Sequence, residues 1–138
     1  MPVTYRIDQE RRRISTTCVG DVSFQEVMDH FAALETDPHC PERLDVLLDL
    51  TTTTSLPDAE QVRAVGAHIG ETRRRVRFGA CAIVTDRDAM FGMSRMLEVL
   101  AEPHFKSTSV FRKLEDAERW LDAEGSPAGR ERGHDARA

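Results

Sequence analysis

The chain has 138 residues, of which 40% are hydrophobic and 31% are charged, and its net charge at pH 7 is −5. These values fit one globular domain with its own core and argue against a globally disordered chain. A net negative charge repels a phosphate backbone, so nucleic-acid binding is not expected.

The sequence carries no sign of export, membrane insertion or metal binding. It lacks the basic start and apolar stretch of a signal peptide, and no run approaches the roughly 20 apolar residues of a membrane helix. Its three cysteines, Cys18, Cys40 and Cys81, are odd in number and form no C-x-x-C motif, so neither a disulfide framework nor a zinc site is indicated. A cytoplasmic protein without a cofactor is therefore expected.

The first part of the chain predicts a β-hairpin followed by a helix. Alternating apolar residues at 3–7 and a β-rich segment at 14–19 flank a polar turn. Ser23 and Glu26 then form an S-x-x-E capping box, and apolar residues recur at helical spacing as far as Leu34. This spacing places Asp29 and His30 mostly on the outward side of the helix.

The middle of the chain predicts two buried strands separated by a helix. Residues 44–50 form a near-continuous apolar run, which is typical of a parallel strand covered on both faces. The hydroxyl-rich segment 51–55 is expected to be a loop, after which Pro57 suits the first turn of a helix. Residues 78–84 are small and apolar, so they predict a strand that a helix or another strand can approach closely.

The last third predicts a helix, a short strand and a final helix. Cap candidates at 85–88 precede a helix marked by Met90, Met93 and Met96, a strand follows at 107–111, and Trp120 belongs to an amphipathic helix. Residues 125–138 are expected to be a disordered tail, which leaves one domain over residues 1–124. The predicted order, β-β-α-β-α-β-α-β-α, indicates an α/β fold with a mixed sheet flanked by helices.

This order and three stretches of sequence resemble the SpoIIAA-like (STAS-like) domains, which are related to the CRAL-TRIO-type lipid-binding domains. The resemblance covers residues 3 to about 122 and extends to bacterial STAS-like proteins of unknown function. The stretches are the helix from Phe24 to Leu34, the strand Leu47-Leu48-Asp49-Leu50 with its threonines, and Met90-Phe91-Gly92-Met93-Ser94-Arg95-Met96 leading to Val110-Phe111-Arg112-Lys113-Leu114-Glu115-Asp116-Ala117.

The resemblance implies a SpoIIAA-like mixed sheet with an N-terminal hairpin and a non-enzymatic role. STAS domains act as anti-sigma-factor antagonists or as regulatory modules of transporters. In the antagonists a kinase phosphorylates a serine at the start of the second helix. The corresponding segment here is 51–55, where Ser55 is the candidate for phosphorylation, although the D-S-S-G pattern of the antagonists is absent.

Two strand-to-helix loops are candidate ligand- or partner-binding sites. Free backbone N–H groups and the positive end of a helix dipole at such a loop can hold an anion or an acidic group. Simple capping and turn formation is the structural alternative for both loops. The candidates are Thr51, Thr52, Thr53, Thr54 and Ser55 in the first loop, and Asp86 and Asp88 in the second.

The methionine-rich helix is a third candidate for binding. Met90 and Phe91 begin this helix, and methionine surfaces suit apolar ligands or several partners. The three-residue spacing of the methionines is equally compatible with core packing, with Phe91 left at a partner surface.

No catalytic or metal-binding constellation can be recognised. The five histidines lack metal-ligand spacing, and the neighbours His39 and Cys40 lack a third group to orient them. The leading hypothesis is therefore a non-enzymatic regulatory or ligand- and partner-binding module that uses both loops. The alternatives are a small apolar-ligand or lipid-binding protein lined by the helix 24–34 with Met90 and Phe91, and an enzyme with an unrecognised site.

The sequence determines neither the partner nor the oligomeric state. An unknown protein partner and a small apolar or anionic ligand both fit the candidate loops. Exposed sheet edges would allow a homodimer, and a monomer fits the sequence equally well.

Overall fold

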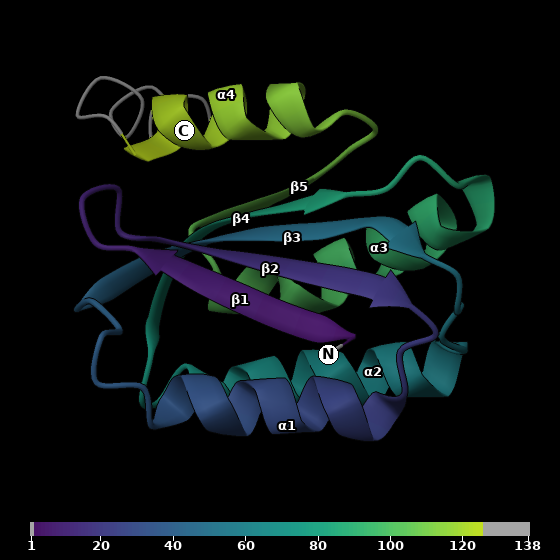
Figure 1. Cartoon of the computed structure of the whole chain (residues 1–138), viewed down its shortest axis with the longest axis horizontal. Helices are drawn as coiled ribbons and strands as arrows, with labels where there is room; N and C mark the ends of the chain where they lie inside the picture. Colours follow the sequence, from purple (N-terminus) through teal and green to yellow (C-terminus); the bar gives the residue numbers. More distant parts are fainter. Residues whose placement is uncertain (1, 126–138) are drawn as a thin grey trace.

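The computed structural model describes residues 2–125 as one sheet between two layers of helices (Figure 1). The predicted order of strands and helices is confirmed, with a short 3₁₀ turn, Glu102–His104, added before the last strand. The predicted tail lies outside the described residues except for Gly125, which ends the last helix. The elements are β1 (Val3–Asp8), β2 (Arg13–Gly20), α1 (Phe24–Glu35), β3 (Arg43–Thr53), α2 (Ala59–Thr72), β4 (Arg77–Val84), α3 (Asp88–Ala101), β5 (Ser107–Phe111) and α4 (Leu114–Gly125).

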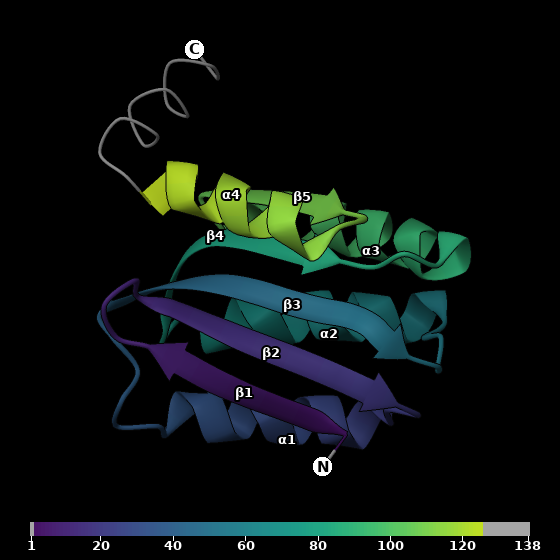
Figure 2. The same cartoon turned by 45° about the horizontal axis from the view of Figure 1, so that its top comes forward.

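The order of the strands in the sheet determines where the helices lie. The strands follow one another as β1-β2-β3-β4-β5, with β1 antiparallel to β2 and the other pairs parallel. Because parallel crossovers are right-handed and each new strand is added on the same side, the three crossover helices fall on one face. Figures 1 and 2 show α1, α2 and α3 on this three-helix face and α4 alone on the opposite α4 face.

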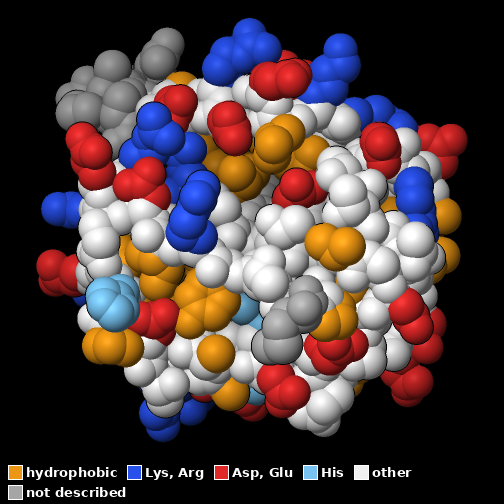
Figure 3. Space-filling model, viewed as in Figure 1, with side chains coloured by type: hydrophobic (Ala, Val, Ile, Leu, Met, Phe, Trp, Pro, Cys, Tyr) orange, Lys and Arg blue, Asp and Glu red, His pale blue; other side chains and the backbone are white. Residues whose placement is uncertain are grey.

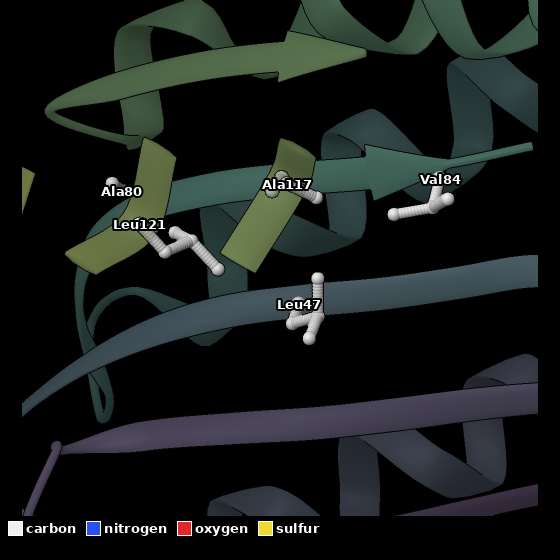
Figure 4. Packing of buried hydrophobic residues seen from close by; sticks show 6 residues of the cluster. Leu47, Ala80, Val84, Ala117 and Leu121 are labelled. Carbon is white, nitrogen blue, oxygen red and sulfur yellow. The ribbon is translucent and has the colours of Figure 1, made fainter. Parts of the chain in front are cut away.

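Small side chains let α4 approach the sheet closely. Ala80 and Ala82 of β4 point toward α4 and meet Ala117 and Leu121, all of them at most 1% exposed (Figure 4). Leu47 of β3 completes this cluster from the neighbouring strand. The predicted close approach of a helix to this strand is therefore confirmed on the α4 face.

β4 contains a β-bulge, which shifts its register against β3. Gly79 and Ala80 together lie opposite Asp45, whose Oδ1 accepts a hydrogen bond from the Ala80 N–H at 2.9 Å. A Cβ atom at Gly79 would collide with the Asp45 carboxylate and would lie 2.9 Å from Nε of Arg43. Only glycine fits at this position of the strand.

On the three-helix face, α2 and α3 pack directly against each other. A Cβ atom added to Gly66 of α2 would lie 3.1 Å from the Cβ of Leu100 in α3. The glycine that weakens the helix propensity of α2 therefore permits a close contact between the two helices. By contrast, α1 touches α2 much less extensively.

Three local predictions at the ends of elements are wrong. The threonine segment is not wholly a loop, because β3 continues through Thr53 and pairs with Val19 and Gly20 of β2. The second helix begins after Pro57, since Asp58 and Gln61 form its capping box. No side chain caps α3, although an aspartate was expected to do so.

Candidate functional site

A cavity of about 470 Å³ lies between the three-helix face of the sheet and the helices above it. Side chains from β1 to β4 form one wall, and α1, α2 and α3 form the other. Its volume falls in the range of about 300–1,000 Å³ that is usual for small-molecule sites. Apolar side chains dominate the lining, among them Phe24, Val27 and Phe31 of α1, Val62 and Val65 of α2, Met90, Met93 and Leu97 of α3, and Ile83 of β4.

The central strand shows most directly that this space is not filled. Val46, Leu48 and Leu50 of β3 point toward the helices, yet each is only partly buried. Leu47, which points to the α4 face of the same strand, is 5% exposed. A strand covered by helices on both faces is therefore closely packed on one face and hollow on the other.

The hollow follows from how far the helices stand from the sheet. The backbone of α4 runs close to β3, β4 and β5. On the three-helix face, α3 comes close to the edge strand β5 and α1 to the edge strand β1, whereas α2 stands further from the strands. Large side chains such as Phe31 and Ile83 lie between the sheet and helices on this side. They hold the layers apart, and the space between them is not completely filled.

Among residues 2–125, His30 of α1 is the one histidine in the cavity wall. Its Nε2 lies 3.4 Å from Oγ1 of Thr16 on β2, and its ring makes an edge contact with Tyr5 at a centroid distance of 5.3 Å. Burial lowers the pKa of His30 below its usual value, so the ring is neutral at pH 7. The Nδ1 atom is buried and has no hydrogen-bond partner within the described protein.

The expectation that His30 faces outward is wrong. His30 follows Val27 by three residues and precedes Leu34 by four, so it lies on the apolar side of α1. The sequence therefore contained a signal for the inward position of His30, namely its spacing from two inward-facing apolar residues.

Except for Asp21, the further polar groups in the cavity wall are uncharged. Ser94 of α3 is 3% exposed, and its Oγ has no hydrogen-bond partner within the described residues. Burial raises the pKa of Cys18 to about 11 and that of Cys81 to about 12, so both thiols stay protonated at neutral pH and are poor nucleophiles. Among the described residues, Asp21 is the one formally charged side chain in the lining.

The two candidate loops meet at one end of the cavity. Arg87 donates hydrogen bonds to the carbonyl oxygens of Thr53 at 2.7 Å and Ser55 at 3.2 Å, which ties the loop after β4 to the loop after β3. Ser55 Oγ accepts a hydrogen bond from the Val22 N–H at 3.0 Å. Thr53, Ser55 and Leu56 also line the cavity, and Leu56 is 47% exposed.

The structure brings only some of the predicted site residues to this cavity. Thr53, Ser55 and Met90 line it, whereas Thr51, Thr52, Thr54, Asp86, Asp88 and Phe91 do not.

Two of the threonines outside the cavity make internal contacts. Thr52 Oγ1 donates to the Cys18 carbonyl at 3.0 Å, and Thr51 Oγ1 donates to the Asp49 carboxylate at 2.6 Å. The Thr52 hydroxyl therefore links β3 to β2, whereas the Thr51 hydroxyl bonds within β3.

Phe91 and Asp88 face a different neighbour. The guanidinium of Arg112 lies 4.4 Å from the centre of the Phe91 ring and also pairs with Asp88 at 3.0 Å. Phe91 therefore does not line the cavity, whereas Met90 and residues of the helix 24–34 do.

The four side chains considered as catalytic groups do not come together. Asp86 and Asp88 follow β4, while His39 and Cys40 precede β3, so the two pairs lie at opposite ends of the parallel strands. His39 instead contacts Asp37, with its Nδ1 3.2 Å from the carboxylate. Within residues 2–125, no group of three or more His, Cys, Asp or Glu side chains is arranged to hold a metal ion.

The surface carries mixed charge. On the face shown in Figure 3, basic and acidic side chains are interspersed, with hydrophobic side chains showing between them. Along the described part of the chain, no helix combines the length and apolar character needed to cross a bilayer.

Comparison with known proteins identifies the fold. No protein-family profile matches the chain, and no curated protein matches its sequence. The structure is similar to the crystal structure of an uncharacterized protein of the DUF3478 family from Shewanella loihica PV-4, with a TM-score of 0.56 over 86% of this chain and 91% of that one. The two chains are 16% identical, and the Shewanella protein is described as having a SpoIIAA-like fold. The chain therefore has a SpoIIAA-like α/β fold, as its sequence predicts.

Proposed function

We propose that the chain is a non-enzymatic module that binds a small apolar molecule in the cavity beneath α1, α2 and α3. The observation that carries this proposal is the partly exposed row Val46, Leu48 and Leu50 on a central strand that helices cover. Unfilled apolar space forfeits dispersion contacts, and a ligand of matching shape restores them. Occupation of the cavity would therefore stabilise the folded chain.

A binding role without catalysis is supported by the chemistry of the wall. The two cavity thiols are protonated at neutral pH, and within the described part of the chain no carboxylate pairs with His30 to make it a general base. The reactive side chains outside the cavity are spread over both ends of the sheet. The groups that remain inside can bind and orient a ligand.

The test uses an uncharged apolar fluorophore, N-phenyl-1-naphthylamine, together with native mass spectrometry of freshly purified full-length protein. We expect saturable binding with one site per chain and a co-purifying small molecule in part of the sample. Leu48→Phe should weaken binding at least about tenfold, because the larger ring occupies space at the centre of the cavity.

The matched control is Leu114→Phe, the same change at an exposed position of α4 outside the cavity. It should bind the fluorophore as the wild type does. If the wild type shows no saturable binding and only the mass of the bare chain, or if both variants bind equally well, the proposal is wrong.

A regulatory role for the loops is the second candidate function. Arg87 links the two loops, and Ser55 lies both in the cavity wall and against the start of α1 through Val22. A ligand in the cavity would therefore contact the segment in which STAS-like antagonists are regulated. Limited proteolysis should show cleavage near residues 54–57 that slows when the fluorophore is bound, and unchanged cleavage would contradict this coupling.

A further inference from the structure

The cavity opens to solvent at one end, where the loops after β2 and β3 form its mouth. Among the described residues that line the cavity, the exposed ones are Asp21, Ser23 and Leu56, and all three belong to these two loops. The loops touch where the Val22 N–H donates to Ser55 Oγ at 3.0 Å. Both loops lie at the arrowhead end of β2 and β3 in Figure 1. A ligand therefore enters beside the starts of α1 and α2.

The opposite end of the cavity is closed by apolar side chains. Leu34, Ile69 and Ala101 line it there, and each is at most 6% exposed. Phe78 and Phe105 pack against this end with a ring-centroid distance of 4.9 Å. A hydrocarbon chain that enters at the mouth therefore ends in apolar surroundings, while a polar group at its other end stays at the mouth and keeps contact with water.

The mouth is acidic. Asp21 is the one formally charged side chain in the lining, and within residues 2–125 no cation pairs with its carboxylate. Residues 20–26 and 54–61, which form the two loops and the first helical turns beside them, carry three further carboxylates and no lysine or arginine. Because carboxylates attract a cation and repel an anion, the mouth favours a cationic group on the ligand.

Arg87 contacts the mouth loops but does not line the cavity. Two of its N–H groups already donate to the carbonyl oxygens of Thr53 and Ser55, at 2.7 and 3.2 Å. An anionic group at the mouth would have to compete with these carbonyls for Arg87, whereas a cationic group meets the carboxylate of Asp21 without displacing a partner.

The size of the cavity limits the apolar part of the ligand. At the packing density of protein interiors, 470 Å³ accommodates on the order of 15–20 carbon atoms. This is the size of one medium-length hydrocarbon chain and is well below that of a two-chain phospholipid.

We propose that the cavity binds a single-chain amphiphile with a cationic head, such as a long-chain amine. The hydrocarbon chain lies between the sheet and the three helices, and the ammonium group stays at the mouth beside Asp21. This inference rests on the proposed function and adds the shape and charge of its ligand. It assigns Asp21 as the residue that determines which head group is preferred.

The experiment measures displacement of N-phenyl-1-naphthylamine at pH 7 and low salt by three probes with the same hydrocarbon chain: decylamine, decanoate and 1-decanol. In the wild type, decylamine should displace the fluorophore at a concentration about three- to fivefold lower than decanoate, because an exposed charge pair contributes modestly. High salt should reduce this preference. Asp21→Lys should reverse it and leave displacement by 1-decanol unchanged, since only the charged probes respond to the charge of the mouth.

The matched control is Asp29→Lys, the same charge change at an exposed position of α1 outside the cavity lining. It should keep the wild-type preference for decylamine, because the two variants have equal net charge and differ only in where the charge lies. Binding of the uncharged fluorophore itself reports whether each variant is folded with its cavity intact.

The outcomes separate the two proposals. Absence of fluorophore binding to the wild type would overturn the proposed function itself. If the fluorophore binds but decanoate matches or exceeds decylamine, the inference about the head group is wrong and the apolar cavity remains a binding site. The inference is equally wrong if Asp21→Lys and Asp29→Lys change the preference alike. A reversal in Asp21→Lys alone supports it.

Discussion

The two faces of the sheet differ in the size of their side chains and in the distance of the helices above them. On the α4 face, Ala80 and Ala82 of β4 meet Ala117 and Leu121, and the contact is closely packed (Figure 4). On the three-helix face, the alternate residues of the same strand are Cys81 and Ile83, and a cavity separates the layers. β4 thus forms a closely packed interface on one face and borders a cavity on the other.

The difference shows that close packing and ligand space follow from the same alternation of side chains. Small residues on one side of a strand bring a helix near, so that few voids are left. Bulkier residues on the other side keep the helices away from the central strands, and side chains of differing shape do not fill all of the resulting space. Stability is therefore expected to reside mainly on the α4 face, and binding on the three-helix face.

The most direct test of this difference is to truncate a leucine side chain to alanine on each face. Leu121→Ala should lower the free energy of unfolding by about 2–5 kcal/mol, because a fully buried side chain is replaced by a void. Leu50→Ala should cost less than about 2 kcal/mol, because Leu50 already borders empty space. Urea unfolding of both variants measures the difference, and equal losses would show that the two faces are packed alike.

Enlarging a side chain should change stability differently on the two faces, whereas in a uniformly packed core both changes would be destabilising. Ala82→Leu should destabilise the chain by about 1–3 kcal/mol, because α4 leaves no room above Ala82. Val46→Leu extends into the cavity and should leave stability unchanged or raise it by up to about 1 kcal/mol. Thermal unfolding followed by circular dichroism tests both, and a marked loss for Val46→Leu would contradict the existence of the cavity.

The pH dependence of the free energy of unfolding tests whether the cavity is free of water around His30. Burial lowers the folded-state pKa of His30 below 6.5, so its contribution is fully present above pH 6.5 and is lost as the pH falls through the folded-state value. The free energy of unfolding should therefore drop on acidification below pH 6.5, by at most about 1.4 kcal/mol per pH unit for this proton.

His30→Phe should flatten this acid slope. Part of the slope should persist, because desolvation and Arg73 also lower the pKa of His104. Identical slopes for the wild type and the variant would mean that His30 is hydrated and that the cavity contains water at this point.

The smallest effect is expected at the loops beside the cavity. Arg87→Ala removes two hydrogen bonds to the Thr53 and Ser55 carbonyls and should cost about 1–2 kcal/mol, with faster amide exchange at residues 53–56. Arg95→Ala is the matched control, on the helix α3 that follows Arg87, because the surface pair of Arg95 with Glu98 at 3.2 Å should contribute less than about 1 kcal/mol. Equal effects of the two changes would show that Arg87 does not hold the loops together.

Local patterns predicted most of the elements but not their ends. The capping box of Ser23 and Glu26 and the apolar spacing that follows are local features, and α1 begins where they indicate. The end of β3 was predicted incorrectly because Thr52 and Thr53 pair with Val19 and Gly20, more than thirty residues earlier in the chain. Threonine suits both loops and strands, so the partner strand decided between them.

The candidate site was predicted only in part for a similar reason. Met90 and the helix 24–34 were assigned to an apolar site from their composition and spacing, and they line the cavity. His30 was missed because histidine is intermediate in burial, so its type does not indicate which side of a helix it occupies, and its burial here depends on Tyr5 and Thr16 from the hairpin. The sequence left Phe91 open between the cavity wall and a partner surface, and the structure places it outside the cavity against Arg112 from the segment after β5.

The sequence by itself determined the order of strands and helices, and it determined which face of β4 carries alanines and which carries larger residues. These are local properties of side-chain size, periodicity and capping. Only the tertiary structure decided that three helices share one face, that they stand away from the central strand, and that residues as distant in the chain as His30 and Ser94 line the same space. Space that no side chain occupies depends on the relative positions of whole layers, and those positions are set by contacts between residues distant in the chain.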